Sequence, residues 1–143
     1  MKRSKTKTLK TAKADTWKVF SLWVRLKDSR HGLNQCYTCG LVGHVKDMHA
    51  GHALGGRHNA VLFDLFLVRP QCRQCNMYNN GQYNRFRLRL IDEFDQEWYD
   101  EKLRLCSKTG RIMKYTTADL DEMIEWFRED IKITSLNRQL EDI

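Results

Sequence analysis

The sequence of 143 residues has about the length of one domain, with room for a modest hydrophobic core. Its formal net charge is +7, and no apolar run approaches the roughly 20 residues that a membrane-spanning helix needs. The N-terminal segment also lacks the apolar stretch of a secretory signal. We therefore expect a cytoplasmic protein that does not enter a membrane.

The charges are distributed unevenly along the chain. Residues 1–91 contain 17 Lys and Arg against four acidic residues, whereas residues 92–143 contain eight against 14. This concentration of positive charge favours binding to a polyanion, with nucleic acid as the main candidate. A basic surface that is simply solvated is the alternative.

The first half of the chain predicts one helix and several hairpins. Residues 1–14 hold six Lys and Arg and no acid, so we expect a tail that stays disordered until phosphates neutralise it. Asp15 is a suitable N-cap for a helix over residues 16–27. Five glycines within residues 40–56 favour hairpins and loops. The apolar run at residues 61–68 is the best strand candidate, which Pro70 would end.

The second half predicts helices. Apolar residues at helical spacing indicate helices over residues 83–94 and 97–105, followed by a turn at 107–110. A last helix begins at Thr116 or Thr117, with acidic residues in its first turn. Its apolar stripe consists of Leu120, Ile124, Phe127 and Ile131.

Four of the five cysteines form two Cys-x-x-Cys pairs. Each pair offers two sulfurs from one tight turn, and four thiolates are a donor set that tetrahedral zinc prefers. In a reducing compartment such pairs indicate a metal rather than disulfides. We therefore predict one structural zinc, bound by Cys36, Cys39, Cys72 and Cys75. Cys106 has no nearby partner and is interpreted as a small buried hydrophobic residue.

The 32 residues between the pairs, 40 to 71, are more than a zinc site alone requires. They include His49 and His52, which precede a glycine-rich turn and can hold a divalent ion and provide a base. Asn76 directly follows the last paired cysteine, where its amide oxygen can reach toward a metal. These features indicate chemistry on phosphate.

These motifs resemble those of the NinG/Rap family of lambdoid phages, over roughly residues 23 to 103. The matching motifs are Trp23-Val24-Arg25-Leu26-Lys27-Asp28, Ala50-Gly51-His52, Pro70-Gln71-Cys72-Arg73-Gln74-Cys75-Asn76, Asn80-Gly81 and Tyr83-Asn84-Arg85-Phe86-Arg87-Leu88. That family is similar to zinc-stapled HNH (ββα-metal) endonucleases. The resemblance implies an α+β fold, with a small zinc-stapled HNH-like ββα-metal core and flanking N- and C-terminal helices. The implied organisation is a basic tail at 1–14, a nuclease domain with an N-terminal helix at 15–106, and a C-terminal amphipathic helical extension at 107–143.

The resemblance also implies catalytic roles. His52 matches the general base that activates water for attack on the scissile phosphodiester. Asn76 matches the last HNH position, a ligand of a catalytic Mg²⁺ or Mn²⁺ ion. His49 stands where the family carries a carboxylate and is the candidate first ligand, which would shift the preference toward Mn²⁺, Ni²⁺ or Zn²⁺. Asp47 is the alternative carboxylate, two residues upstream.

A second departure from the family's pattern is Leu67, five residues before Cys72. An asparagine is expected there, and it normally braces the loop that bears the base. Asp64 or Asn59 could substitute for it. Six arginines are candidates for phosphate contacts, although those after residue 84 are also typical of a solvated helix face. They are Arg57, Arg69, Arg73, Arg85, Arg87 and Arg89.

Three classes of function compete. The first is a metal-dependent phage endonuclease that cleaves branched recombination intermediates, such as Holliday junctions or D-loops, and recognises DNA shape. A junction resolvase cuts two strands symmetrically, so this class predicts a homodimer. The second class is a non-catalytic zinc-containing DNA-binding recombination accessory protein. The third is a protein-interaction module whose acidic C-terminal helix binds a partner, such as a recombination protein.

Overall fold

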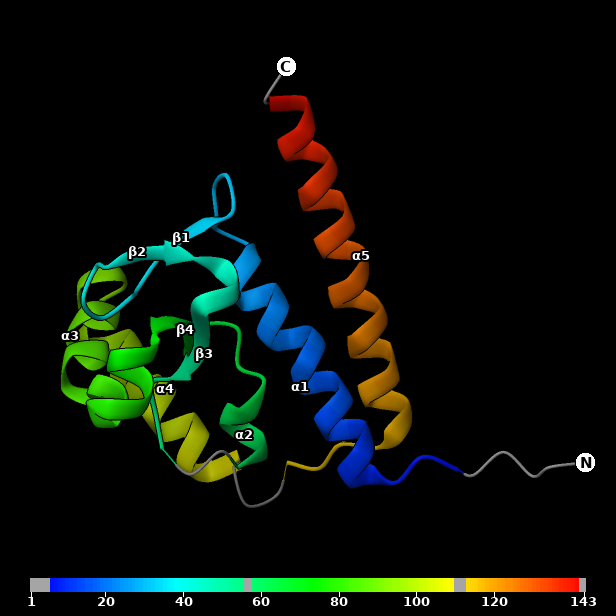
Figure 1. Ribbon diagram of the computed structural model, residues 1–143. Helices are drawn as coiled ribbons and strands as arrows, with labels where there is room; N and C mark the ends of the chain where they lie inside the picture. Colours follow the sequence, from blue (N-terminus) through cyan, green and yellow to red (C-terminus); the bar gives the residue numbers. More distant parts are fainter. Residues whose placement is uncertain (1–5, 56–57, 110–112, 142–143) are drawn as a thin grey trace, which may run out of the picture. The chain divides into compact units, whose positions relative to one another are not determined.

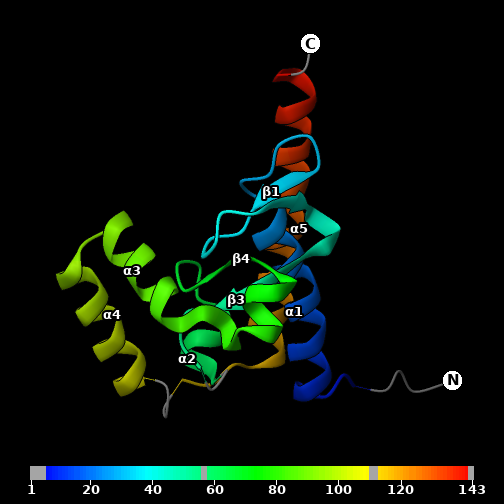
Figure 2. The ribbon, with the colours of Figure 1, turned by 60° about the vertical axis from the view of Figure 1, so that its left-hand side comes forward.

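The computed structural model describes residues 6–55, 58–109 and 113–141 (Figures 1 and 2). The helices and strands are, in chain order, α1 (Leu9–Leu26), β1 (Leu33–Gln35), β2 (Val42–His44), β3 (Met48–His52), α2 (Asn59–Leu62), β4 (Val68–Cys72), α3 (Tyr83–Glu93), α4 (Gln96–Thr109) and α5 (Thr117–Glu141). The shorter helical turns are η1 (Val45–Asp47), η2 (Gln74–Tyr78) and η3 (Asn80–Gln82).

The chain divides into two compact units, and the fold mixes helices with small hairpins. One unit comprises Met1–Trp23 together with Tyr115–Ile143, and the other comprises Val24–Lys114. The long helix α1 begins in the first unit and ends in the second. No helix within the described residues is both long enough and apolar enough to cross a lipid bilayer.

In the first unit, α1 and α5 lie side by side and run in the same direction (Figure 1). The Phe20 and Phe127 rings pack with their centroids 5.2 Å apart, and Trp23 Nε1 donates to Asp130 Oδ2 at 2.7 Å. Both contacts join residues that are 107 positions apart in the sequence, which is what two parallel helices produce. Aromatic side chains therefore form the core of this unit.

Helix α1 begins at Leu9 rather than at residue 16. Thr8 caps it, because its side-chain oxygen accepts a backbone N–H three residues later at 3.2 Å. Ala12 in the first turns is completely buried. Residues 9–14, which were expected to be disordered as part of the basic tail at 1–14, are therefore helical, because Thr8 caps the helix directly before them.

Helix α5 begins where it was predicted. Asp119 N donates to Thr116 Oγ1 at 3.1 Å, and Thr116 N donates to Asp119 Oδ2 at 2.8 Å, which is a reciprocal cap. The first three residues of the predicted stripe are buried and the fourth is half-buried. They are Leu120, Ile124, Phe127 and Ile131.

In the second unit, two antiparallel strand pairs involve the segment between the cysteine pairs, as its glycines predicted. Strand β1 pairs with β2, and β3 pairs with β4. Within the second pair, Met48 lies opposite Cys72 and His52 lies opposite Val68. This register places the strand that carries both histidines beside the strand that ends at the third paired cysteine.

The predicted strand over residues 61–68 is wrong. Its first two residues lie in α2, which ends at Leu62. The Asp64 carboxylate then accepts two backbone N–H groups, at 2.8 and 2.9 Å, and turns the chain. Strand β4 begins only at Val68, and Pro70 lies inside it rather than after it. Periodicity cannot separate helix from strand in so short an apolar run.

Helices α3 and α4 confirm the helices predicted over residues 83–94 and 97–105. The predicted turn at 107–110 is helical as far as Thr109, and Gly110 lies outside the described residues. Cys106 is buried, as predicted. The hydrophobic core of this unit includes Ala53, Val61, Leu67, Phe86, Leu90, Tyr99 and Cys106.

We predict that Phe127→Ala lowers the free energy of unfolding by about 3–5 kcal/mol, because the ring is 4% exposed and packs on Phe20 and Trp23. Urea unfolding followed by circular dichroism measures the change. The control is Leu136→Ala on the same helix, where the side chain is 59% exposed and the expected change is below about 0.5 kcal/mol. Equal losses in the two variants would contradict the packing described for α1 and α5.

Candidate metal centre and catalytic residues

Four cysteine sulfurs converge in the second unit. Cys36 and Cys39 lie in the turn after β1, whereas Cys72 ends β4 and Cys75 lies in η2. Their Sγ atoms all lie within 4.8 Å of one another, and those of Cys39 and Cys72 are 3.7 Å apart. Zinc–sulfur bonds of about 2.3 Å in a tetrahedron place the sulfurs about 3.8 Å apart. The four cysteines therefore form a cluster that fits one zinc ion.

Backbone hydrogen bonds shape the two cysteine turns. Gly40 N donates to Cys36 O at 2.9 Å, and Cys36 N donates to Leu41 O at 2.8 Å. Gly40 has a φ of +80°, in the left-handed region that favours glycine. In the second turn, Cys75 N lies 3.5 Å from Cys72 Sγ and donates toward it. Both turns thus direct two sulfurs toward a common point.

The electrostatics of the cluster favour a cation. Burial acts to raise the pKa of Cys36, but hydrogen bonds from Thr38 and from nearby backbone groups outweigh it and lower the pKa to about 6. Burial raises the pKa of Cys75 to about 12. Four thiolates this close repel one another, and a bound dication allows all of them to ionise.

The structure brings His49 and Asn76 together. His49 lies in β3 and Asn76 in η2, one residue after the fourth paired cysteine. His49 Nδ1 and Asn76 Nδ2 are 3.0 Å apart, and both side chains are half-buried. Two candidate ligands from distant parts of the sequence thus meet beside the cysteine cluster.

His52 contacts a different part of the unit. Its Nε2 lies 3.2 Å from the carbonyl oxygen of Leu62, at the end of α2. A carbonyl can only accept, so this hydrogen bond requires the proton on Nε2 and leaves Nδ1 as the basic nitrogen. Side chains alternate between the faces of a strand, so His49 and His52, three positions apart, point to opposite faces of β3. The histidine that the structure shows in contact with Asn76 is His49.

Leu67, at the position of the expected asparagine, is a core residue with 1% of its surface exposed. Its carbonyl oxygen accepts the N–H of Ala53, the residue after His52, at 2.7 Å. A backbone hydrogen bond therefore links this position to the strand end that carries the histidine.

The two suggested replacements for that asparagine have other partners. Asp64 pairs with Lys102 at 2.8 Å and accepts N–H groups of its own loop. Asn59 Nδ2 donates to the carbonyl oxygen of Met113 at 2.7 Å. The His52 ring instead contacts the backbone carbonyl oxygen of Leu62, at 3.2 Å.

Asp47, the alternative carboxylate, is exposed in η1. Within the described part of the chain, the four cysteines are the cluster of Cys, His, Asp or Glu side chains that is close enough to hold a metal. Neither Asp47 nor His49 belongs to it. The donors that the structure brings together at the second candidate site are an imidazole and an amide.

The candidate arginines lie in different settings. Arg69 is buried, donates from Nε to Phe66 O at 2.9 Å and pairs with Glu93 at 3.3 Å. Arg57 lies outside the described residues. The remaining four are exposed or half-buried, after β4 or along α3. They are Arg73, Arg85, Arg87 and Arg89.

Gln71 is a structural link that sequence reasoning did not single out. Its fully buried side chain donates from Nε2 to Thr38 Oγ1 at 3.0 Å and to Gly81 O at 2.9 Å. A Cβ on residue 51 would lie 1.8 Å from Gln71 Oε1, so the Gln71 side chain can pack against β3 at this point only because residue 51 is glycine. The amide thus joins the first cysteine turn to η3 across the strand pair. The sequence shows only that Gln71 directly precedes Cys72, and this position does not indicate whether the side chain is buried.

Comparison with known proteins identifies one family. The family model described as Bacteriophage Lambda NinG protein matches residues 1–138. No curated protein and no solved structure matches the chain significantly. The matched range includes the four clustered cysteines, both histidines of β3 and Asn76.

We predict that each chain binds one zinc ion, and that Cys72→Ser abolishes this binding or weakens it. The control is Cys106→Ser, because that thiol is also buried but lies outside the cluster. Elemental analysis after dialysis should give about one zinc in the wild type and the control, and well below one in Cys72→Ser. Equal zinc contents in the two variants would contradict the proposed ligand set.

We also predict that Gly51→Ala lowers the free energy of unfolding by about 1–3 kcal/mol, because the new methyl group collides with the Gln71 amide and disturbs its hydrogen bonds. Gly55→Ala is the control, since its nearest neighbour would be Tyr83 Oη at an ordinary 3.6 Å. Urea titrations of both variants measure the difference. An unchanged Gly51→Ala protein would show that the amide is not fixed over β3.

Proposed function

Because the chain belongs to the bacteriophage lambda NinG family, we propose that it is a metal-dependent DNA endonuclease of phage recombination. The match over residues 1–138 is the observation that carries this proposal, since it includes every residue of the HNH-like motif. The proposed substrates are branched DNAs such as Holliday junctions or D-loops. The proposed place of action is the cytoplasm of the bacterial host.

Charge supports a DNA substrate. Residues 1–91 hold 17 of the 25 Lys and Arg and four of the 18 acidic residues. A polyanion releases counterions when such a surface binds it, which supplies affinity without base recognition. Short hairpins and loops offer little that could enter a DNA groove, so recognition of backbone and shape is favoured.

In the proposed reaction, His52 is the general base. Its Nε2 proton is engaged with the carbonyl of Leu62, so its Nδ1 can take a proton from water. The resulting hydroxide attacks phosphorus, the bond from phosphorus to the 3′ oxygen breaks, and a solvent proton converts that oxygen to a hydroxyl group. The products carry a 5′ phosphate and a 3′ hydroxyl.

His49 and Asn76 would hold the catalytic cation. Their side chains meet at 3.0 Å, and one imidazole with one amide suits Mn²⁺ better than Mg²⁺, which prefers carboxylate and water oxygens. When bound, such an ion stabilises negative charge on the phosphoryl group. Asp47 remains a candidate third ligand, from its exposed position in η1.

The second candidate function is a non-catalytic, zinc-containing DNA-binding accessory protein. One observation favours it: by the alternation of side chains along a strand, His52 points to the opposite face of β3 from His49. In that case the cysteine cluster would organise a DNA-binding surface alone. For either function we propose that the acidic helix α5 contacts a recombination protein, and for the nuclease we propose a homodimer.

We predict that His52→Ala lowers the cleavage rate of a labelled four-way junction at least about 100-fold while junction binding is retained. The control is His58→Ala, because His58 is exposed and makes no side-chain capping bond at α2. Cleavage is measured on gels with Mg²⁺, with Mn²⁺ and without added metal. Tight binding by the wild type without cleavage in any metal would favour the accessory function.

His49→Ala separates a metal ligand from a base. Loss of a ligand weakens metal binding, so raised Mn²⁺ should restore part of the cleavage in His49→Ala but none in His52→Ala. If raised Mn²⁺ restored cleavage only in His52→Ala, His52 would be the metal ligand and His49 the base.

A further inference from the structure

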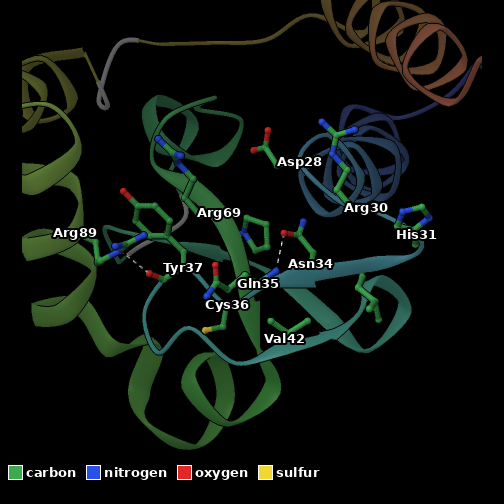
Figure 3. Close-up of a pocket in the computed structure, with 12 residues that line it drawn as sticks. Asp28, Arg30, His31, Asn34, Gln35, Cys36, Tyr37, Val42, Arg69 and Arg89 are labelled. Atoms are coloured by element: carbon green, nitrogen blue, oxygen red, sulfur yellow. Dashed lines mark hydrogen bonds between the residues drawn. The ribbon is translucent and has the colours of Figure 1, made fainter. Parts of the chain in front are cut away.

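A pocket of about 490 Å³ lies in the second unit, between the first cysteine turn, β1 and α3 (Figure 3). Three of its described lining side chains are arginines, namely Arg30, Arg69 and Arg89, and one is an acid, Asp28. The pocket therefore carries excess positive charge. The site proposed for catalysis does not include it, because neither histidine of β3 nor Asn76 lines it.

A stack of two arginines on one tyrosine forms one side of the pocket. The guanidinium carbons of Arg69 and Arg89 lie 4.8 and 5.0 Å from the centroid of the Tyr37 ring. Glu93 accepts a hydrogen bond from Tyr37 Oη at 2.5 Å and pairs with Arg69 at 3.3 Å. The stack thus contains two guanidinium groups, and the Glu93 carboxylate pairs with only that of Arg69, so the stack keeps a net positive charge.

Arg89 is held in place by its surroundings. Its Nε donates to Tyr37 O at 3.0 Å (Figure 3). Tyr37 N in turn donates to Pro70 O at 2.8 Å. Tyr37 directly follows the first cysteine of the cluster, Cys36. Among the described residues, the terminal NH₂ groups of Arg89 have no hydrogen-bond partner. A fixed guanidinium with unused donors suits the oxygens of a phosphate.

We propose that this pocket binds a backbone phosphate of the DNA, with Arg89 as the principal contact and Arg30 as a second cation at the opposite end. The inference rests on the proposed action on DNA, and adds to it a strand-positioning site separate from the catalytic residues. The guanidinium carbons of Arg69 and Arg89 lie 4.8 and 5.0 Å from the centroid of the Tyr37 ring, where a stacked base would compete with them, so phosphate recognition is favoured over base recognition.

The test compares Arg89→Ala with Arg104→Ala. Both remove one positive charge from the second unit, but Arg104 is exposed on α4, pairs with Glu101 and lies outside the pocket. Fluorescence anisotropy with a labelled junction, without added Mg²⁺ or Mn²⁺, measures affinity between 50 and 200 mM salt, a range in which phosphate contacts have large effects. We expect Arg89→Ala to weaken binding about tenfold at low salt and to reduce the salt slope by about 0.9, and Arg104→Ala to change neither.

Two further measurements make the result specific. Thermal melting of each variant shows whether it has lost its fold. Arg30→Ala tests the opposite end of the pocket, where a smaller loss of DNA affinity than in Arg89→Ala, with unchanged melting, supports the proposal. Equal affinities of Arg89→Ala and Arg104→Ala for the junction overturn the proposal that the pocket binds a phosphate, whether or not the protein cleaves DNA. A loss in Arg89→Ala alone supports it even if no metal produces cleavage, in which case only the nuclease proposal falls. A wild-type protein that binds no DNA at 50 mM salt overturns both.

Discussion

The four-sulfur cluster is the constraint on which the second unit depends. Its strands are only three to five residues long, and such short pairs have little stability by themselves. Among the described residues, the buried cluster around the sulfurs contains Met48 and three of the cysteines, Cys36, Cys72 and Cys75. A zinc ion held by this cluster would join a turn at Cys36 and Cys39 to a strand end more than 30 residues away, and would so replace contacts that a larger core supplies.

Both candidate functional regions extend directly from this cluster. Tyr37 follows Cys36 and supports the stacked guanidinium of Arg89, whereas Asn76 follows Cys75 and meets His49. A shift of either cysteine turn would therefore move the proposed phosphate-binding arginine or the proposed metal ligand by a comparable distance. The buried Gln71 amide adds a second link across the same strands, and it restrains the first cysteine turn from within the protein.

Sequence reasoning succeeded where the information was local. The cysteine spacing predicted the cluster, and helical periodicity together with the Thr116 cap predicted α3, α4 and α5. It missed two side-chain caps that are also local but leave no periodic signal: the Asp64 carboxylate turns an apolar run that looked like a strand, and the Thr8 cap extends α1 toward the basic terminus. The meeting of His49 with Asn76 depends on how η2 packs against β3, and no local pattern contains that information.

The loss of the expected asparagine is physically tolerable. A bracing asparagine offers a carbonyl oxygen that accepts the proton of one imidazole nitrogen, and the backbone carbonyl of Leu62 makes that same contact with His52. With the acceptor supplied by the end of α2, the side chain at Leu67 is released to pack in the core, where a buried amide would need partners of its own. The tautomer that general-base catalysis requires can therefore be kept without the asparagine, and the departure at Leu67 by itself does not argue against activity.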